Sequence, residues 1–576
     1  MSVRTSLVRT ALFPIVMAAA AMAASCSADT AATPAKPSAA STAIAGAAPT
    51  RSALPSTPAP TPTQAQVPPT PAPKRGGTLK IAQSADPTSC DLHSSRASGY
   101  VSVHTCNPLL SQIVRNPGRD HALIEPDLAV SWSSSGDGVS WEFKLRPGAQ
   151  WHDGSTVTAG DLKFSLDRII APPASVQIGR AAAFARYVTK TESVEAIDAV
   201  TLRIRTDYPA AAFVATLASV YVSIYPKAAV EKLNPPSPVA FMSVIGSGPF
   251  KATAAVRGSS YKLTRFDAYY EPALPYLDEV QFLIMPEPAV RMAALKSHSI
   301  DTIAIVTDPE AETLSRDLAG KVSIFASPSA GGSTVQMNVA RAPFDNPAVR
   351  RAVNLAISRA DASLALGEGL SGAVMMPGGA WALSTQEVAK LPGSGDGAAN
   401  RAEAKKLLAQ AGFENGFDVK MQVRADPFAQ TLADFAAGQL RQVGIRAEVV
   451  PTEPGAYQTL VVKHDFAMLA HSHSFAMDEP DAVLFDNYSC TGFENYPGLC
   501  DPGIEEMLQK QSRELDRSKR KALVDELQRR IWDADAKVWF QWTIRRTPVW
   551  SNVHGMEPGG PSLYQGRRLE RVYLEP

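Results

Sequence analysis

Alternation of hydrophobic and polar residues marks the clearest strands of this chain. Residues 139–145, VSWEFKL, alternate between the two types, and Val419, Met421 and Val423 alternate with polar neighbours further along. Successive side chains of a strand point to opposite faces, so each run predicts a strand with one buried face. The run at 445–450, IRAEVV, predicts a further strand.

A helical period separates these strands in the second half of the chain. The apolar residues of this period are Phe428, Leu432, Phe435, Leu440 and Val443. Gly444 follows them and predicts the end of a helix. Strand, helix and strand within about thirty residues predict a βαβ unit with two parallel strands. A short helix near 454–463 then leads to the strand FAMLA at 466–470.

Two other helices are indicated by their first residues. Thr158 with Asp161 forms a capping-box pattern after the turn sequence HDG. Asn346 followed by Pro347 is a second typical helix start. The apolar face that follows consists of Val349, Ala352, Val353, Ala356 and Ile357. The fold class that these elements predict is α/β.

The N-terminus has the pattern of an export signal. Two arginines precede an apolar run at 11–24, which is shorter than the roughly 18 residues of a membrane helix. No later apolar run is longer, so we expect an exported chain that does not itself span the membrane. The sequence AASC at 23–26 resembles a lipobox and makes Cys26 the expected lipidation site. The alternative is cleavage after AMA at 21–23, which gives a soluble secreted protein.

Residues 27–75 differ in composition from everything after them. They hold eleven prolines among alanine, serine and threonine and almost no large apolar residue. Such a segment cannot bury enough surface to order itself, so we predict a disordered tether. The globular part is expected to begin at GGTLKIA, 76–82.

Bulk composition excludes some partners. The chain has 576 residues, which is too long for a single core and predicts at least two lobes. Lysine plus arginine equals 56, as does aspartate plus glutamate, so no overall charge favours nucleic acid or an anionic membrane.

Lipidation of Cys26 leaves four of the five cysteines, whose close spacings predict two disulfides. The predicted pairs are Cys90–Cys106 and Cys490–Cys500.

The stretch HSHSFAMDEPD, 471–481, holds the most reactive group of side chains and begins where a predicted strand ends. In open α/β sheets, ligands bind beyond the carboxyl ends of strands. His471 and His473 would share one side of a continued strand and, with Asp478 or Glu479, could form a metal or acid/base site. No third ligand or nucleophile has a recognisable spacing, so we expect neither a metal nor another cofactor. The glycines of GEGLSG, 367–372, follow a helix and do not predict a nucleotide site.

Several segments together resemble the extracytoplasmic solute-binding proteins of the peptide/nickel type, family 5. They are GGTLKIAQSADPTSCD; residues 126–168, from PDLAVSW to DLKFSLDR; GSGPFKA; YYEPALPYLDEVQFLIM; MNVARAPFDNPAVRRAVNLAISRADA; and AKKLLAQAGF. They occur in order across the whole globular region.

The resemblance implies a two-lobed clamp of type II with an extra subdomain. Lobe I would hold residues 76–122, 246–325 and 541–576. The extra subdomain would hold 123–245 and lobe II 326–540. Because the chain would cross between lobes more than once, the crossings could act as hinges.

The resemblance also implies a site in lobe II. In peptide-binding members an aspartate three residues before the final acid of an acid–proline pair holds the ligand's amino group. That pair is Glu479-Pro480 here, and the matching position is Ala476, so Asp478 is the substitute that a shifted register would supply. The expected ligand-binding residues are His471, His473, Ser474, Phe475, Asp478 and Glu479.

We therefore expect a non-catalytic, monomeric lipoprotein on the outer side of the cytoplasmic membrane. It would bind a peptide or similar small solute and deliver it to the membrane subunits of an ABC permease. The alternatives are an exported metal-dependent hydrolase that uses His471, His473 and Asp478, and a sensory or adhesive receptor on the same fold.

Overall fold

The structure is a computed structural model, and it describes residues 73–97, 99–117, 123–367, 369–473, 475, 477–556 and 568–575. The predicted signal peptide with Cys26, the tether as far as residue 72, and Ser474 and Ala476 lie outside the described residues. Within the described ranges, no helix combines the length and the apolar character that crossing a membrane requires.

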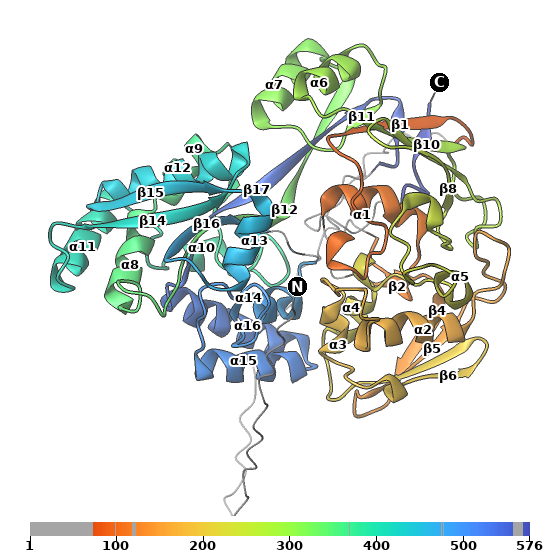
Figure 1. The fold of residues 1–576 in the computed structure, drawn as a ribbon, viewed down its shortest axis with the longest axis horizontal. Coiled ribbons are helices and arrows are strands. Elements are labelled where there is room, and N and C mark those ends of the chain that lie inside the picture. The colour runs from red at the N-terminus through yellow and green to blue at the C-terminus, as the bar shows by residue number, and fades with distance from the viewer. Residues whose placement is uncertain are drawn as a thin grey trace, which may run out of the picture. The chain divides into compact units, whose positions relative to one another are not determined.

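Eleven of the described strands form one mixed sheet (Figure 1). Its strands in spatial order are β15 (Ile445–Thr452), β14 (Phe417–Arg424), β16 (Met468–Ser472), β12 (Val322–Met337), β17 (Lys537–Trp550), β11 (Thr302–Ile303), β1 (Thr78–Gln83), β10 (Glu279–Ile284), β9 (Ser260–Arg265) and β8 (Phe250–Val256), with β13 (Gly369–Leu370) beside β17. The pairs β14–β15 and β1–β10 are parallel, whereas β12 and β17 run antiparallel. The parallel βαβ unit predicted from the sequence is confirmed.

Two long strands connect the two ends of this sheet. Strand β12 pairs with β17 from Val322 opposite Trp550 to Gln336 opposite Lys537. The ladder is interrupted between Pro328 and Gly332. Figure 1 shows both strands running between the elements of the first lobe and those of the second lobe. The predicted boundaries 325/326 and 540/541 fall inside these strands, and the exact domain limits stay a prediction.

Hydrophobic packing separates the molecule into two main groups of buried residues. The first joins Leu79 and Phe282 to the extra subdomain and to the C-terminal Val572. The second packs β14, β16 and the inner ends of β12 and β17 under α8 (Pro347–Ala356) and α12 (Pro427–Arg441). This division is the two-lobed α/β architecture expected from the sequence.

The extra subdomain is built on a separate antiparallel sheet. Its strand order is β4 (Ala129–Ser134), β5 (Ser140–Leu145), β7 (Thr201–Arg205) and β6 (Val194–Asp198). Helix α2 (Ala159–Ile170) packs beside β6 and β7. The predicted capping box between Thr158 and Asp161 is present at its start.

The remaining helices surround these sheets. In the first lobe they are α1 (Tyr100–Cys106), α6 (Pro288–Lys296) and α7 (Asp308–Asp317), and in the extra subdomain α3 (Ala182–Ala185), α4 (Phe213–Leu217) and α5 (Lys227–Val230). In the second lobe they are α9 (Arg359–Ala365), α10 (Thr385–Val388), α11 (Gly397–Gln410), α13 (Pro454–Val462), α14 (Asp486–Tyr488), α15 (Pro502–Arg513) and α16 (Arg517–Asp533). Two short hairpins, β2 (Val114–Arg115) with β3 (Glu125–Pro126) and β18 (Val553–His554) with β19 (Tyr573–Leu574), complete the first lobe.

The helix starts and the cysteine pairs agree with the sequence analysis. Asn346 caps α8 through the amide of Ala348. The Cα atoms of Cys90 and Cys106 are 5.4 Å apart, and those of Cys490 and Cys500 are 4.6 Å apart. Both pairs lie at disulfide distance. One residue of the predicted apolar face of α12 differs: Phe428, in the first turn, is 44 % exposed, whereas Ala429 beside it is buried.

Candidate functional site

A cavity of about 240 Å³ lies where the extra subdomain meets the second lobe. The subdomain contributes an apolar wall, which consists of Ile124, Ala211, Val214 and Ala215. The second lobe contributes Ala380, Trp381, Met477, Asp478, Glu479, Leu515, Arg517 and Arg520. These residues come from five separate parts of the chain.

Asp478 is the unusual group in this cavity. Its side chain is buried, and its carboxylate has no side-chain partner within the described part of the chain. Gly379 makes room for it, because a Cβ there would lie 2.3 Å from Oδ2 of Asp478. Burial and the neighbouring Glu479 charge raise the pKa of Asp478 to about 7, although a backbone hydrogen bond from Ala380 opposes this shift. A buried carboxylate without a counter-charge is costly, and a bound cation would remove that cost.

The acids beside Asp478 are already satisfied by protein groups. Arg520 contacts Glu479 and lies 3.2 Å from Oδ1 of Asp481. Asp481 also accepts hydrogen bonds from Gln511 Nε2 at 2.6 Å and Ser512 Oγ at 2.5 Å. Burial raises the pKa of Glu479, although Arg520 opposes this shift. Glu479 and Asp481 are therefore bound by protein groups that hold the loop in place. Asp478 has no such side-chain partner among the described residues and could bind a ligand.

Trp381 forms the floor of the cavity beside two arginines. The guanidinium carbons of Arg520 and Arg517 lie 4.8 Å and 5.5 Å from the centre of its ring. Both distances are within the range of cation–π contacts. The cavity is thus lined by an aromatic ring that two arginines contact and by the buried carboxylate of Asp478.

The two predicted histidines lie together, but they face the protein. Their rings are 4.7 Å apart, on one side of β16 and its continuation, as the spacing predicts. Nε2 of His473 accepts a hydrogen bond from Gln336 Nε2 at 2.9 Å, and Nδ1 of His471 is 3.0 Å from the Tyr457 hydroxyl. Burial lowers the pKa of His473 to about 4, and it lowers the pKa of His471 well below its usual value. Both rings are therefore neutral at pH 7.

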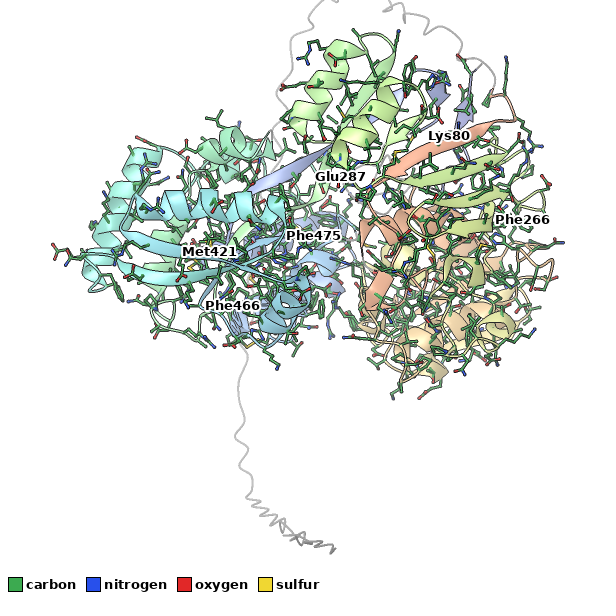
Figure 2. The ribbon with its side chains drawn as sticks, turned by 45° about the horizontal axis from the view of Figure 1, so that its top comes forward. Lys80, Phe266, Glu287, Met421, Phe466 and Phe475 are labelled. Atoms are coloured by element: carbon green, nitrogen blue, oxygen red, sulfur yellow. A yellow bond between two sulfur atoms is a disulfide. The ribbon has the colours of Figure 1, made fainter. Side chains whose placement is uncertain are left out.

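The other predicted residues divide between the core and the cavity. Phe475 is buried against Trp539 and Trp542, with ring centres 6.0 Å from each. Figure 2 shows Phe475 among the elements of the second lobe. Asp478 and Glu479 line the cavity, whereas His471, His473 and Phe475 are absent from its lining. Nothing in the structure tests their contact with a solute.

A buried lysine that the sequence analysis missed lies near the histidines. Nζ of Lys537 donates to Asn487 Oδ1 at 2.6 Å and to the carbonyl of Glu494 at 2.7 Å. Burial lowers the pKa of Lys537 to about 7. Only its place at the start of a strand could have drawn attention to it. In the described ranges no three histidine, cysteine, aspartate or glutamate side chains are grouped as metal ligands.

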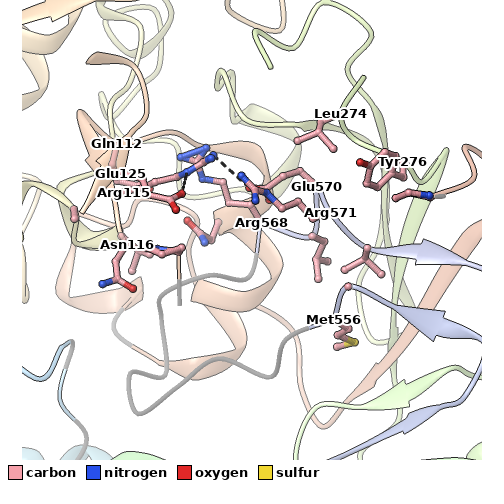
Figure 3. A pocket seen from close by; sticks show the side chains of 18 of the residues that line it. Gln112, Arg115, Asn116, Glu125, Leu274, Tyr276, Met556, Arg568, Glu570 and Arg571 are labelled. Carbon is pink, nitrogen blue, oxygen red and sulfur yellow. Dashed lines mark hydrogen bonds and ion pairs between the residues drawn. The ribbon is translucent and has the colours of Figure 1, made fainter. Parts of the chain in front are cut away.

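A second cavity, of about 440 Å³, lies in the first lobe (Figure 3). Arg115 lines this cavity and pairs with Glu271 at 2.7 Å and with Glu570 at 3.4 Å. Arg568 pairs with the buried Asp127. These ion pairs attach the C-terminal segment to the first lobe.

Comparison with known proteins agrees with this architecture. Residues 124–495 match the family described as bacterial extracellular solute-binding proteins, family 5 Middle. The chain is 29 % identical to the glutathione-binding protein GsiB of Pectobacterium atrosepticum over 426 residues, which cover 71 % of this chain and 78 % of that protein. It is 31 % identical to the GsiB protein of Escherichia coli K12 over 57 % of this chain and 61 % of that protein.

Two solved structures are similar over nearly their whole length. The periplasmic binding protein DppA of Helicobacter pylori, in complex with the peptide STSA, has a TM-score of 0.75 at 25 % identity. AgaA of A. tumefacien R10, in complex with agropinic acid, has a TM-score of 0.74 at 25 % identity. Each comparison covers 87 % of this chain and 99 % of the other. The metal-dependent hydrolase alternative finds no support among these proteins. The chain belongs to the bacterial extracellular solute-binding proteins of family 5, and it serves an ABC importer as the component that binds the solute.

Proposed function

We propose that the solute is a small peptide-like molecule that carries a positive charge and binds between the extra subdomain and the second lobe. The observation that carries this proposal is the buried carboxylate of Asp478 at the cavity between them, which has no side-chain partner among the described residues. An ammonium group in the cavity would supply the missing counter-charge. Trp381 would contact an apolar part of the solute, and Arg517 offers a partner for a carboxylate.

The size of the cavity limits the solute. A volume of about 240 Å³ lies just below the range for small-molecule sites, which begins at roughly 300 Å³. A solute of about the size of a dipeptide or tripeptide fits this space better than a long peptide. Capture would follow the hinge between the lobes, and binding would shift the population toward the closed form.

Titration calorimetry against three named compounds tests the proposed solute class. Reduced glutathione, the tetrapeptide Ser-Thr-Ser-Ala and agropinic acid are bound by relatives of this chain, and they differ in charge and size. We expect a compound with a free amine to bind, and mass spectrometry of the purified native protein to show a copurified amine. A copurified solute without a positive charge would contradict the proposal.

Asp478→Asn should weaken the binding of an amine-bearing solute by about ten- to a hundredfold. Loss of one buried charged hydrogen bond costs about 1–3 kcal/mol. The matched comparison is a double variant, His471→Ala with His473→Ala, whose side chains lie at the end of β16 and just after it, outside the cavity lining. A loss of affinity confined to the histidine variant, with an unchanged melting temperature, would move the solute site away from Asp478.

We also propose that the protein is a monomeric lipoprotein on the outer side of the membrane, held there by a lipid on Cys26 and a flexible tether at 27–75. The support is the lipobox-like sequence AASC and the extracellular family. Cys26→Ser should move the protein from the membrane fraction to the soluble exported fraction, as cell fractionation would show. Equal amounts of both proteins in the membrane fraction would argue against lipidation.

A further inference from the structure

The extra subdomain contacts the second lobe through a small set of polar side chains. The Tyr187 hydroxyl donates to Oδ2 of Asp481 at 2.8 Å. The Arg186 guanidinium donates to the carbonyl of Asp481 at 3.0 Å and to Oδ1 of Asp486 at 2.7 Å. These partners are separated by about three hundred residues, so their contact depends on the fold and not on the local chain.

Aromatic and main-chain contacts support the same interface. The Arg186 guanidinium carbon lies 4.8 Å from the centre of the Phe485 ring. Further along the subdomain, the amide of Ala211 donates to the carbonyl of Ser512 at 3.0 Å. The Arg513 guanidinium carbon lies 4.6 Å from the centre of the Tyr208 ring. The interface thus extends along one side of the cavity.

Asp481 connects this interface to the cavity. It is fully buried and lies three residues after Asp478. Gln511, Ser512 and Arg520 bind it from the second lobe, and Tyr187 binds it from the subdomain. If the lobes part, Asp481 keeps its three partners in the second lobe, so the Tyr187 hydrogen bond can break without leaving a bare buried charge.

The ion pair between Arg186 and Asp486 is also suited to a reversible contact, because both side chains are partly exposed. Arg186 is half-buried, and the Asp486 side chain is 28 % exposed. Opening would return both charges to water at little cost. Closing aligns them in a geometry that is specific to one arrangement of the lobes, since Arg186 must reach two acceptors at once.

We propose that the extra subdomain acts as the latch of the clamp: Arg186 and Tyr187 hold the loop 478–486 of the second lobe in the closed form and are positioning residues for solute capture. The inference rests on the proposed function for its role in capture, but the latch itself is a property of the solute-free chain. The subdomain is thus a moving part of the binding mechanism.

Distance measurement between spin labels tests the latch without any solute. Labels at Val200→Cys on the subdomain and Glu403→Cys on the second lobe occupy exposed positions away from the interface. In the otherwise unaltered chain we expect a population at the short distance of the closed form. Arg186→Ala combined with Tyr187→Phe should reduce the ratio of closed to open molecules about tenfold or more.

Two further variants distinguish a latch from a purely structural role. Arg186→Lys keeps the charge and should restore part of the short-distance population. Arg203→Ala removes an arginine that pairs with Glu142 and Glu195 inside the subdomain, and it should leave the distances unchanged. An unchanged distribution in the double variant, or no closed population in the parent chain, would overturn the latch. Failure of the tested solutes to bind would leave this measurement intact.

Discussion

Replacing Asp91 with alanine should destabilise the first lobe by about 3–5 kcal/mol. Its carboxylate is fully buried and pairs with both terminal nitrogens of Arg168, whose side chain is 3 % exposed. Ser237 Oγ donates to the same carboxylate at 2.5 Å. Removing one partner leaves the Arg168 charge buried and uncompensated, which accounts for the large effect. Urea unfolding followed by a probe in the first lobe would measure it.

Two comparison variants make this expectation specific. The double variant Asp91→Leu with Arg168→Met removes both charges and should restore much of the stability, because burying an ion pair costs nearly as much as the pair returns. Asp418→Asn breaks the exposed pair with Arg446, and it should leave the unfolding midpoint unchanged. If Asp91→Ala were no more damaging than Asp418→Asn, the buried pair would carry no net stability.

Asp478→Asn should stabilise the solute-free protein at pH 8 while having little effect at pH 4. Burial raises the pKa of Asp478 to about 7, above its ordinary value of 3.8. A group whose pKa is raised by folding contributes stability that is present below the unfolded pKa and is lost as the pH rises through the folded pKa. The stability of the parent chain should therefore fall between about pH 4 and pH 7, by up to about 4 kcal/mol.

Melting curves across this pH range, with solute removed by partial unfolding and refolding, would show the difference. The asparagine variant should lose the part of the decline that belongs to Asp478. Glu479→Gln is a useful contrast, since Glu479 is paired with Arg520 and its replacement should destabilise the protein. Parallel melting curves of the parent chain and Asp478→Asn from pH 4 to pH 8 would refute an unpaired carboxylate in the folded protein.

The sequence predicted local elements well because their signals are local. The alternation at Val419, Met421 and Val423 became β14, and the helix start at Asn346 became α8. The parallel pairing of β14 with β15 followed from a short βαβ connection. The two-lobed division came from the family resemblance, since periodicity alone cannot place strands such as β12 and β17 in both lobes.

The predicted solute-binding residues stay a prediction. Asp478 and Glu479 line the cavity between the subdomain and the second lobe. The histidines were chosen for their position at a strand end, and their rings contact Gln336 and Tyr457. Tyr187, Arg186 and Trp381 have no local pattern that distinguishes them. Their partners are more than a hundred residues away, and such contacts are visible only after the chain has folded.

Residues that follow the second lobe in the sequence complete the core of the first lobe. Val549, Leu569 and Val572 belong to the same core as Leu79 near the start of the globular part. Because these three residues follow the second lobe in the sequence, this core cannot be complete before the second lobe has been synthesised. The second lobe draws its buried residues from Val335 to Phe540 and can assemble earlier. The first lobe therefore completes its core after the second lobe, although most of its own core residues precede the second lobe in the sequence.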